Sequence, residues 1–169
     1  IEQLRAEDPG NAARLDNLEA VAPTELVDER ALIDLGDRVL ELLHLGRGHT
    51  DGDLWLRVSD ADLLLAGDLV EESGPPAYGP DSFPLEWAAT LDSALELMGP
   101  ATVVVPGHGA PVDVDFVRRQ QAEIDAVAQE IARLHTAAVP VDAALAEGAW
   151  PLPRETLRHA VARGYAALG

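Results

Sequence analysis

Three side chains that could bind a metal ion each stand in or next to a glycine-containing turn. His49 lies in a turn with glycines at positions 48 and 52, Asp68 follows the apolar run 63–67, and His108 follows the apolar run 103–107. Glycine lets the backbone bend sharply and approach a ligand closely. Imidazole and carboxylate groups without thiolate suit zinc, and also iron or manganese. We therefore predict that His49, Asp68 and His108 converge on a metal site.

The spacing of these residues is not diagnostic by itself. Asp68 follows His49 by 19 positions and His108 follows Asp68 by 40, so there is no local metal-binding signature. Taken singly, a Gly-His pair is usually an ordinary loop, and an aspartate at the end of a strand usually belongs to a turn or a helix cap. The metal-site hypothesis depends on the three segments together.

Other residues are weaker candidates. His44 precedes the His49 turn and could support it, whereas His135 lies near the end of a predicted helix, where a protonated imidazole is favoured, and His159 is expected on a helix surface. Tyr78, in a Gly/Pro-rich loop, and Phe83 just beyond it are candidates for the border of a substrate pocket. Loops often set specificity on a fixed scaffold, although this loop could equally be a packed connector.

The elements that would position these residues give an α/β chain. Short strand-like runs come first, over 31–35, 38–45, 54–58 and 62–66. A helix starting near 81 or 82 and ending before Gly99, a buried strand over 102–105, and three helices over 113–135, 141–147 and 153–168 follow. The first 20 residues resemble a weak helix. We expect one domain of β-hairpins, then helix, strand and C-terminal helices.

The amino-acid composition excludes several classes of function. The 169 residues contain no cysteine, so thiolate ligands, cysteine nucleophiles and disulfides are excluded. The formal charge of −18 repels phosphate backbones, which makes nucleic acid a poor partner. We also expect no membrane association, because no apolar run reaches the 18 residues that a membrane span needs. Nothing in the sequence indicates export, so we expect a cytoplasmic protein.

Together, the three segments resemble the later motifs of the metallo-β-lactamase-fold superfamily. The resemblance covers about residues 30–115, and it implies that residues 1–169 are the C-terminal portion of an αββα sandwich with a helical extension over about 113–169. It implies that His49 completes a three-histidine site for a first metal, that Asp68 bridges two metals, and that His108 binds the second. Two zinc ions, or iron or manganese, would generate a metal-bound hydroxide for hydrolysis.

The first motif of that superfamily, His-x-His-x-Asp-His, is absent, since residues 1–48 contain only His44. One explanation is that the chain is the C-terminal part of a longer hydrolase and is inactive alone, with the N-terminal half missing. The alternative is a natural half-domain, a non-catalytic interaction module or one that a partner complements. Such an open half-sandwich would form a homodimer or aggregate to cover its apolar face.

The resemblance implies a small-molecule substrate, namely an ester, thioester or lactone. A true β-lactamase is less favoured, because many of those enzymes carry cysteine where this chain has Asp68. Nuclease members of the superfamily fit the charge of −18 poorly. Diiron flavoprotein members usually carry a flavodoxin-like domain, for which this chain has no room.

Overall fold

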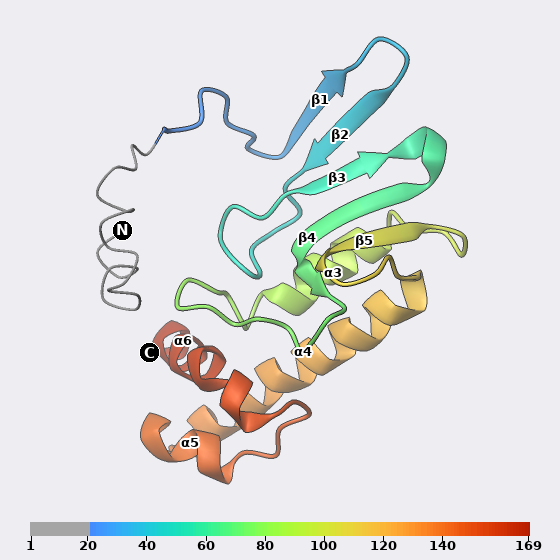
Figure 1. Cartoon of the computed structure of the whole chain (residues 1–169). Coiled ribbons are helices and arrows are strands. Elements are labelled where there is room, and N and C mark those ends of the chain that lie inside the picture. The colour runs from blue at the N-terminus through green and yellow to red at the C-terminus, as the bar shows by residue number, and fades with distance from the viewer. Residues whose placement is uncertain (1–20) are drawn as a thin grey trace, which may run out of the picture.

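The computed structural model describes residues 21–169 as one mixed sheet with helices packed beside it (Figure 1). The strands follow one another in the order β1-β2-β3-β4-β5. Their bounds are β1 Arg30–Asp34, β2 Val39–Leu43, β3 Trp55–Val58, β4 Leu63–Glu71 and β5 Val103–His108. The α-helices are α3 Trp87–Leu95, α4 Val114–Thr136, α5 Val141–Glu147 and α6 Arg158–Leu168. The predicted α/β class is confirmed, and the helix predicted in the first 20 residues lies outside the described part.

Strands β1 to β4 form an antiparallel meander. The β1–β2 turn closes where the Leu35 N–H donates to the Arg38 carbonyl at 2.8 Å. Gly36 adopts a φ of +94°, a conformation that glycine reaches without strain. The β3–β4 connection is a short 3-10 helix, Ser59–Ala61, followed by Asp62 in the left-handed region. Both turns fall between the strand-like runs predicted from the sequence.

Strand β5 instead lies parallel to β4, with Leu63 opposite Val103. A parallel pair needs a crossover connection, and here the crossover contains α3 (Figure 1). Because the carboxyl ends of parallel strands meet at one edge of a sheet, this topology carries Asp68 and His108 to the same edge. The register of the pair shifts on both sides of Gly67, which is the mark of a bulge.

Several predicted boundaries were wrong. Strand β4 continues past residue 66 to Glu71, and β5 continues past residue 105 to His108. The sequence pattern placed the strand ends at the glycine and proline positions, but the register shifts absorb these residues within the ladder. Helix α3 begins at Trp87 rather than near 81, because the segment 84–86 forms a separate turn.

Helix α4 covers the predicted range and buries one apolar face. Its N-terminus is capped by Asp113, whose side chain accepts the Phe116 N–H at 2.8 Å. Its buried apolar residues recur at helical spacing: Val114, Val117, Ile124, Val127, Ile131 and Leu134. The last predicted helix divides into a short 3-10 turn, Arg154–Thr156, and α6.

Coverage of the sheet is uneven. Figure 1 shows the helices gathered near β4 and β5, whereas the β1–β2 hairpin stands away from them. The apolar side chains of that hairpin are accordingly exposed, by 59% at Leu32 and 58% at Leu35. Within residues 21–169, no helix is both long and apolar enough to cross a bilayer.

Candidate metal centre

The three predicted ligands meet around one carboxylate. The Nε2 atom of His49 lies 3.6 Å from one oxygen of Asp68, Oδ2. The Nε2 atom of His108 lies 3.5 Å from the other oxygen, Oδ1. The two imidazoles therefore face different oxygens of the same side chain. All three side chains are reachable by solvent, with His49 23%, Asp68 42% and His108 66% exposed.

These separations exceed a hydrogen bond and suit a shared cation. Two ligands of one tetrahedral zinc ion, each about 2.1 Å from the metal, lie roughly 3.4 Å apart. Among the described residues, no group of three or more His, Cys, Asp or Glu side chains is placed to hold a metal ion. The arrangement is instead two imidazole–carboxylate pairs that share Asp68. Each pair supplies two donors, which is half of a four-coordinate zinc shell.

The ring orientation of His49 suits metal binding. Its Nδ1 atom lies 2.9 Å from the carbonyl oxygen of Ala77. A carbonyl only accepts hydrogen bonds, so Nδ1 must carry the proton in this contact. In the neutral ring, the lone pair is then on Nε2, the atom nearest Asp68. Histidine ligands of metals are commonly held in this way by a backbone carbonyl.

Aromatic packing fixes the same ring from another side. The indole of Trp87 meets the His49 ring edge-on, with centroids 5.9 Å apart. Trp87 is fully buried, and its Nε1–H donates to the Leu69 carbonyl at 3.2 Å. The His49 ring is thus held between the loop that carries Ala77 and the first turn of α3.

Hydrogen bonds within the turn that carries His49 stabilise it. The Thr50 N–H and hydroxyl donate to the two carboxylate oxygens of Asp53, at 2.9 and 2.7 Å. His44, the predicted supporting residue, places its Nε2 atom 3.1 Å from the Asp51 carbonyl. A Cβ at Gly48 would lie 2.6 Å from a methyl group of Leu69 and 2.9 Å from Cδ1 of Trp87, so another residue there would displace these buried side chains. The glycine motif therefore has a packing reason as well as a conformational one.

Glycine is also required beside Asp68. A Cβ at Gly107 would lie 1.9 Å from Asp68 Oδ1 and 2.9 Å from the Asp68 backbone nitrogen. The two strand ends are joined further on, where the Glu72 N–H donates to the His108 carbonyl at 3.1 Å. The Pro-Gly-His sequence thus allows β5 to pass close to the candidate bridging carboxylate.

The remaining histidines lie elsewhere. His135, near the end of α4 as predicted, meets Tyr165 edge-on with centroids 5.3 Å apart. His159 is exposed on α6, as predicted. Neither forms an ion pair with a described carboxylate.

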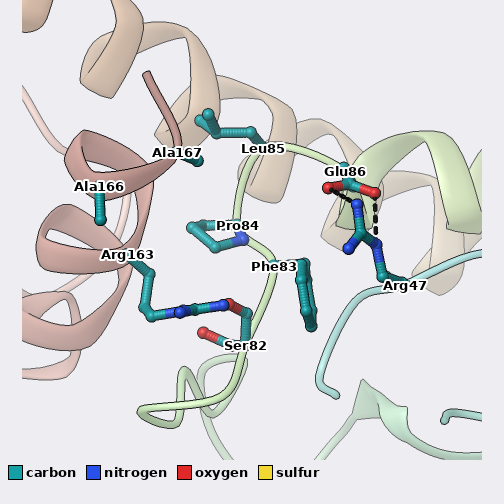
Figure 2. Close-up of a pocket in the computed structure, with 9 residues that line it drawn as sticks. All are labelled: Arg47, Ser82, Phe83, Pro84, Leu85, Glu86, Arg163, Ala166 and Ala167. Carbon is teal, nitrogen blue, oxygen red and sulfur yellow. Dashed lines mark hydrogen bonds and ion pairs between the residues drawn. The ribbon is translucent and has the colours of Figure 1, made fainter. Parts of the chain in front are cut away.

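The two candidate substrate residues have different surroundings. Tyr78 is 5% exposed and packs edge-on against Trp87, with centroids 5.1 Å apart. Its hydroxyl has no hydrogen-bond partner among the described residues, and burial, followed by the nearby Glu123 carboxylate, raises the pKa of Tyr78. In this structure Tyr78 anchors its loop against Trp87. Phe83 does line a hollow, together with Arg47 and Arg163 (Figure 2).

Sequence reasoning missed the Ala77 carbonyl and the Trp87 indole, although both hold His49. A backbone carbonyl has no sequence signature, and Ala77 is 28 positions from its partner. The glycine at position 48 was the visible sign of close packing around the turn, but it did not reveal which residues pack there.

Comparison with known proteins assigns the family. Residues 3–108 match the family described as the Metallo-beta-lactamase superfamily, and that span contains all three candidate ligands. The chain belongs to the metallo-beta-lactamase superfamily. The matched segment ends at His108, so helices α4, α5 and α6 lie beyond it.

Curated relatives of this superfamily member include both thioesterases and β-lactamases. The chain is 34% identical to the acyl-coenzyme A thioesterase MBLAC2 of Bos taurus, over 63% of this chain and 39% of that protein. It is 28% identical to the metallo-beta-lactamase type 2 of Bacillus cereus, over 46% of this chain and 31% of that protein. The chain thus spans about two fifths or less of the length of these relatives.

Solved structures agree on the fold. A metallo-beta-lactamase from Pontibacter korlensis superposes with a TM-score of 0.56 at 21% identity, over 72% of this chain and 53% of that chain. The DIM-1 metallo-beta-lactamase superposes with a TM-score of 0.53 at 21% identity, over 72% of this chain and 60% of that chain. At this identity the similarity establishes the metallo-beta-lactamase fold and not the substrate.

Proposed function

We propose that His49, Asp68 and His108 form part of the metal site of a hydrolase that cleaves thioesters or related small esters and lactones. The observation that carries the proposal is the placement of the two imidazoles on opposite oxygens of Asp68, at 3.6 and 3.5 Å. A carboxylate contacted in this way can serve two cations at once. A bound divalent cation would polarise the scissile carbonyl and acidify a water molecule.

The described residues have defined parts in this proposal. The carboxylate of Asp68 would hold the two cations at a fixed separation. It is itself held in place by Gly107, where a Cβ would lie 1.9 Å from Asp68 Oδ1. The Nε2 atom of His49 would bind the cation through its lone pair, because Nδ1 carries the proton and donates it to the Ala77 carbonyl. His108 is the most exposed of the three, which leaves its side of the site open to substrate. The further ligands that each cation needs would come from outside residues 21–169.

Among ester-like substrates we favour a thioester. The MBLAC2 protein of Bos taurus, to which the chain is 34% identical, is named an acyl-coenzyme A thioesterase. Its similarity extends over more of this chain than that of the Bacillus β-lactamase. The absence of cysteine throughout the sequence is also atypical of the many β-lactamases that use a cysteine ligand.

The proposal is tested by assaying the zinc-loaded chain, together with the segment that supplies the further metal ligands, against butyryl-coenzyme A, p-nitrophenyl butyrate and a small lactone. We expect hydrolysis that a chelator abolishes and added zinc restores, with butyryl-coenzyme A the best substrate. Asp68→Asn should lower the rate at least about 10-fold, because supporting and ligating groups at metal sites typically contribute that much or more. His159→Ala is the matched control. Equal rates for Asp68→Asn and the unaltered protein would overturn the proposal.

A second candidate function is a non-catalytic half-domain that binds a second copy or a complementing partner. It is favoured by the exposed apolar residues of the β1–β2 hairpin, which lie on the outermost described strand pair: Leu32, Ile33, Leu35 and Val39, each 41–59% exposed. Sedimentation over a range of protein concentrations tests it. We expect a dimer that Leu32→Glu disrupts, whereas a monomer at every concentration would contradict this candidate.

A further inference from the structure

A hollow of about 200 Å³ lies between α6 and the loop that precedes α3 (Figure 2). Its walls are the loop 82–86, the side chain of Arg47, and the α6 residues Arg163, Ala166 and Ala167. Arg47 is two positions before His49, and the Phe83 N–H donates to the Gly48 carbonyl at 2.8 Å. The hollow is thus built directly onto the turn that presents His49.

Two guanidinium groups flank the Phe83 ring in this hollow. The Cζ atom of Arg47 lies 4.3 Å from the ring centroid and that of Arg163 lies 5.2 Å from it. Figure 2 shows the two groups on opposite sides of the ring. Cation–π contacts of this kind hold a guanidinium in place without neutralising its charge.

The two arginines differ in their remaining partners. Arg47 donates from Nε and Nη2 to the two oxygens of Glu86, at 2.9 and 2.7 Å, so its charge is compensated. Arg163 donates from Nε to the Ser82 carbonyl at 3.0 Å, which carries no formal charge. None of the ion pairs among residues 21–169 includes Arg163. This is notable in a chain where 30 acidic residues face 12 basic ones.

The free end of Arg163 is suited to an oxyanion. With Nε engaged, its two terminal amino groups are the donors left over, and a guanidinium binds phosphate or carboxylate through such paired donors. Ala166 and Ala167 are exposed and have short side chains, so the hollow beside Arg163 is open. The contacts to Ser82 and Phe83 fix the guanidinium before any ligand arrives.

We propose that this hollow binds a phosphate of the thiol carrier of the substrate, with Arg163 as the anion-binding residue. The anion site is inferred from the positions of Arg163, Phe83 and Ala167. The identity of the carrier depends, in addition, on the proposed thioester hydrolysis. The connection through Phe83 and Gly48 would place the carrier beside the His49 turn while its acyl group reaches the metal site.

The test is direct binding of free coenzyme A and of pantetheine, the same carrier arm without phosphates, measured by calorimetry. Neither compound has an acyl group, so the readout is independent of turnover. We expect coenzyme A to bind at least about 10-fold more tightly than pantetheine, and Arg163→Gln to weaken coenzyme A binding about 10-fold, as is typical for loss of a charged hydrogen-bond partner. Arg158→Gln, on the same helix but outside the hollow, should change neither affinity.

Because Arg163 also supports the loop through Ser82, a second variant separates binding from structure. Ala167→Glu places a carboxylate at the rim of the hollow and leaves Arg163, Ser82 and Phe83 unsubstituted, and it should weaken coenzyme A binding at least about 5-fold through like-charge repulsion. Ala162→Glu, exposed on the same helix, is its control. Equal affinities for coenzyme A and pantetheine, or unchanged coenzyme A binding in both Arg163→Gln and Ala167→Glu, would overturn the proposal. Coenzyme A binding without thioester hydrolysis, once the segment with the further metal ligands is supplied, would refute the proposed function and would leave the anion-site proposal intact.

Discussion

The carbonyl oxygen of Ala77 lies 2.9 Å from Nδ1 of His49 and thereby fixes which nitrogen of the ring faces Asp68. Ala77 belongs to the Gly/Pro-rich loop, and its neighbour Tyr78 is the residue that buries this loop against Trp87. The tautomer of a candidate metal ligand therefore depends on the packing of a residue that does not touch the metal site itself.

Replacing Tyr78 by alanine should release this loop. We expect Tyr78→Ala to lower the free energy of unfolding by about 3–4 kcal/mol, because a large buried side chain is lost. The Nδ1–H tautomer of His49 should also no longer dominate. Long-range ¹⁵N–¹H NMR of the imidazole nitrogens measures the tautomer, and denaturant unfolding measures the stability.

Tyr78→Phe is the matched variant. It keeps the ring that packs on Trp87 and removes a buried hydroxyl that has no hydrogen-bond partner among the described residues. An unsatisfied buried hydroxyl is costly, so Tyr78→Phe should leave stability unchanged or raise it by up to about 1 kcal/mol. A destabilisation of Tyr78→Phe as large as that of Tyr78→Ala would show that the hydroxyl, and not the ring, holds the loop.

Gly107→Ala should disturb the candidate site without removing a ligand. The new methyl group would lie 1.9 Å from Asp68 Oδ1, so the carboxylate or the strand must move. We expect zinc affinity to fall at least about 10-fold, the size of effect seen when the groups supporting a metal ligand are changed. Competition with a chromophoric chelator measures this affinity. Gly74→Ala, where a Cβ meets nothing within 4 Å, should bind zinc as the unaltered protein does.

The sequence predicted the elements well where one periodicity dominated. The stripe of α4, from Val117 to Leu134, and the four meander strands follow directly from helical and alternating patterns. His49, Asp68 and His108 were found because each stands directly after a glycine, and the parallel pairing of β4 and β5 brings the last two to one edge. The glycines next to Asp68 and His108 thus led to strand ends that were predicted too early, and the same glycines indicated the candidate site.

Long-range contacts could not be predicted. The bond between Arg163 and Ser82 joins residues 81 positions apart, and nothing in either local sequence anticipates it. The same holds for the start of α3, where Ser82 and Pro84 indicate a helix but the chain first makes a separate turn. Tertiary packing decides such details, and a single sequence contains little information about it.

A pH dependence of stability is expected from Glu130. This buried carboxylate accepts hydrogen bonds from Arg133 and from the Ala149 N–H, and chiefly the Arg133 contact lowers the pKa of Glu130 below its ordinary value of 4.5. A depressed folded-state pKa gives stability that is present above 4.5 and is lost as the pH falls through the folded-state value. Glu130→Gln should therefore cost about 2 kcal/mol at pH 7 and progressively less under acid conditions.

Unfolding of Glu130→Gln and of the unaltered protein across pH 3 to 8 checks this prediction. Glu155→Gln, an exposed carboxylate with no hydrogen bond among the described residues, should show no such pH-dependent difference. A gap between Glu130→Gln and the unaltered protein that stays constant down to the acid limit would mean that Glu130 contributes packing rather than charge.

We propose that His49 and His108 bind metal together with a shared Asp68. The proposal is tested most directly by elemental analysis of the zinc-loaded, extensively dialysed protein, beside an Asp68→Ala, His108→Ala double variant. A His135→Ala, His159→Ala double variant is the control, since it also removes two titratable side chains but lies away from Asp68. We expect zinc in the unaltered protein and in the control, and its loss from the Asp68→Ala, His108→Ala variant. Equal zinc in all three proteins, or none in any of them, would contradict it.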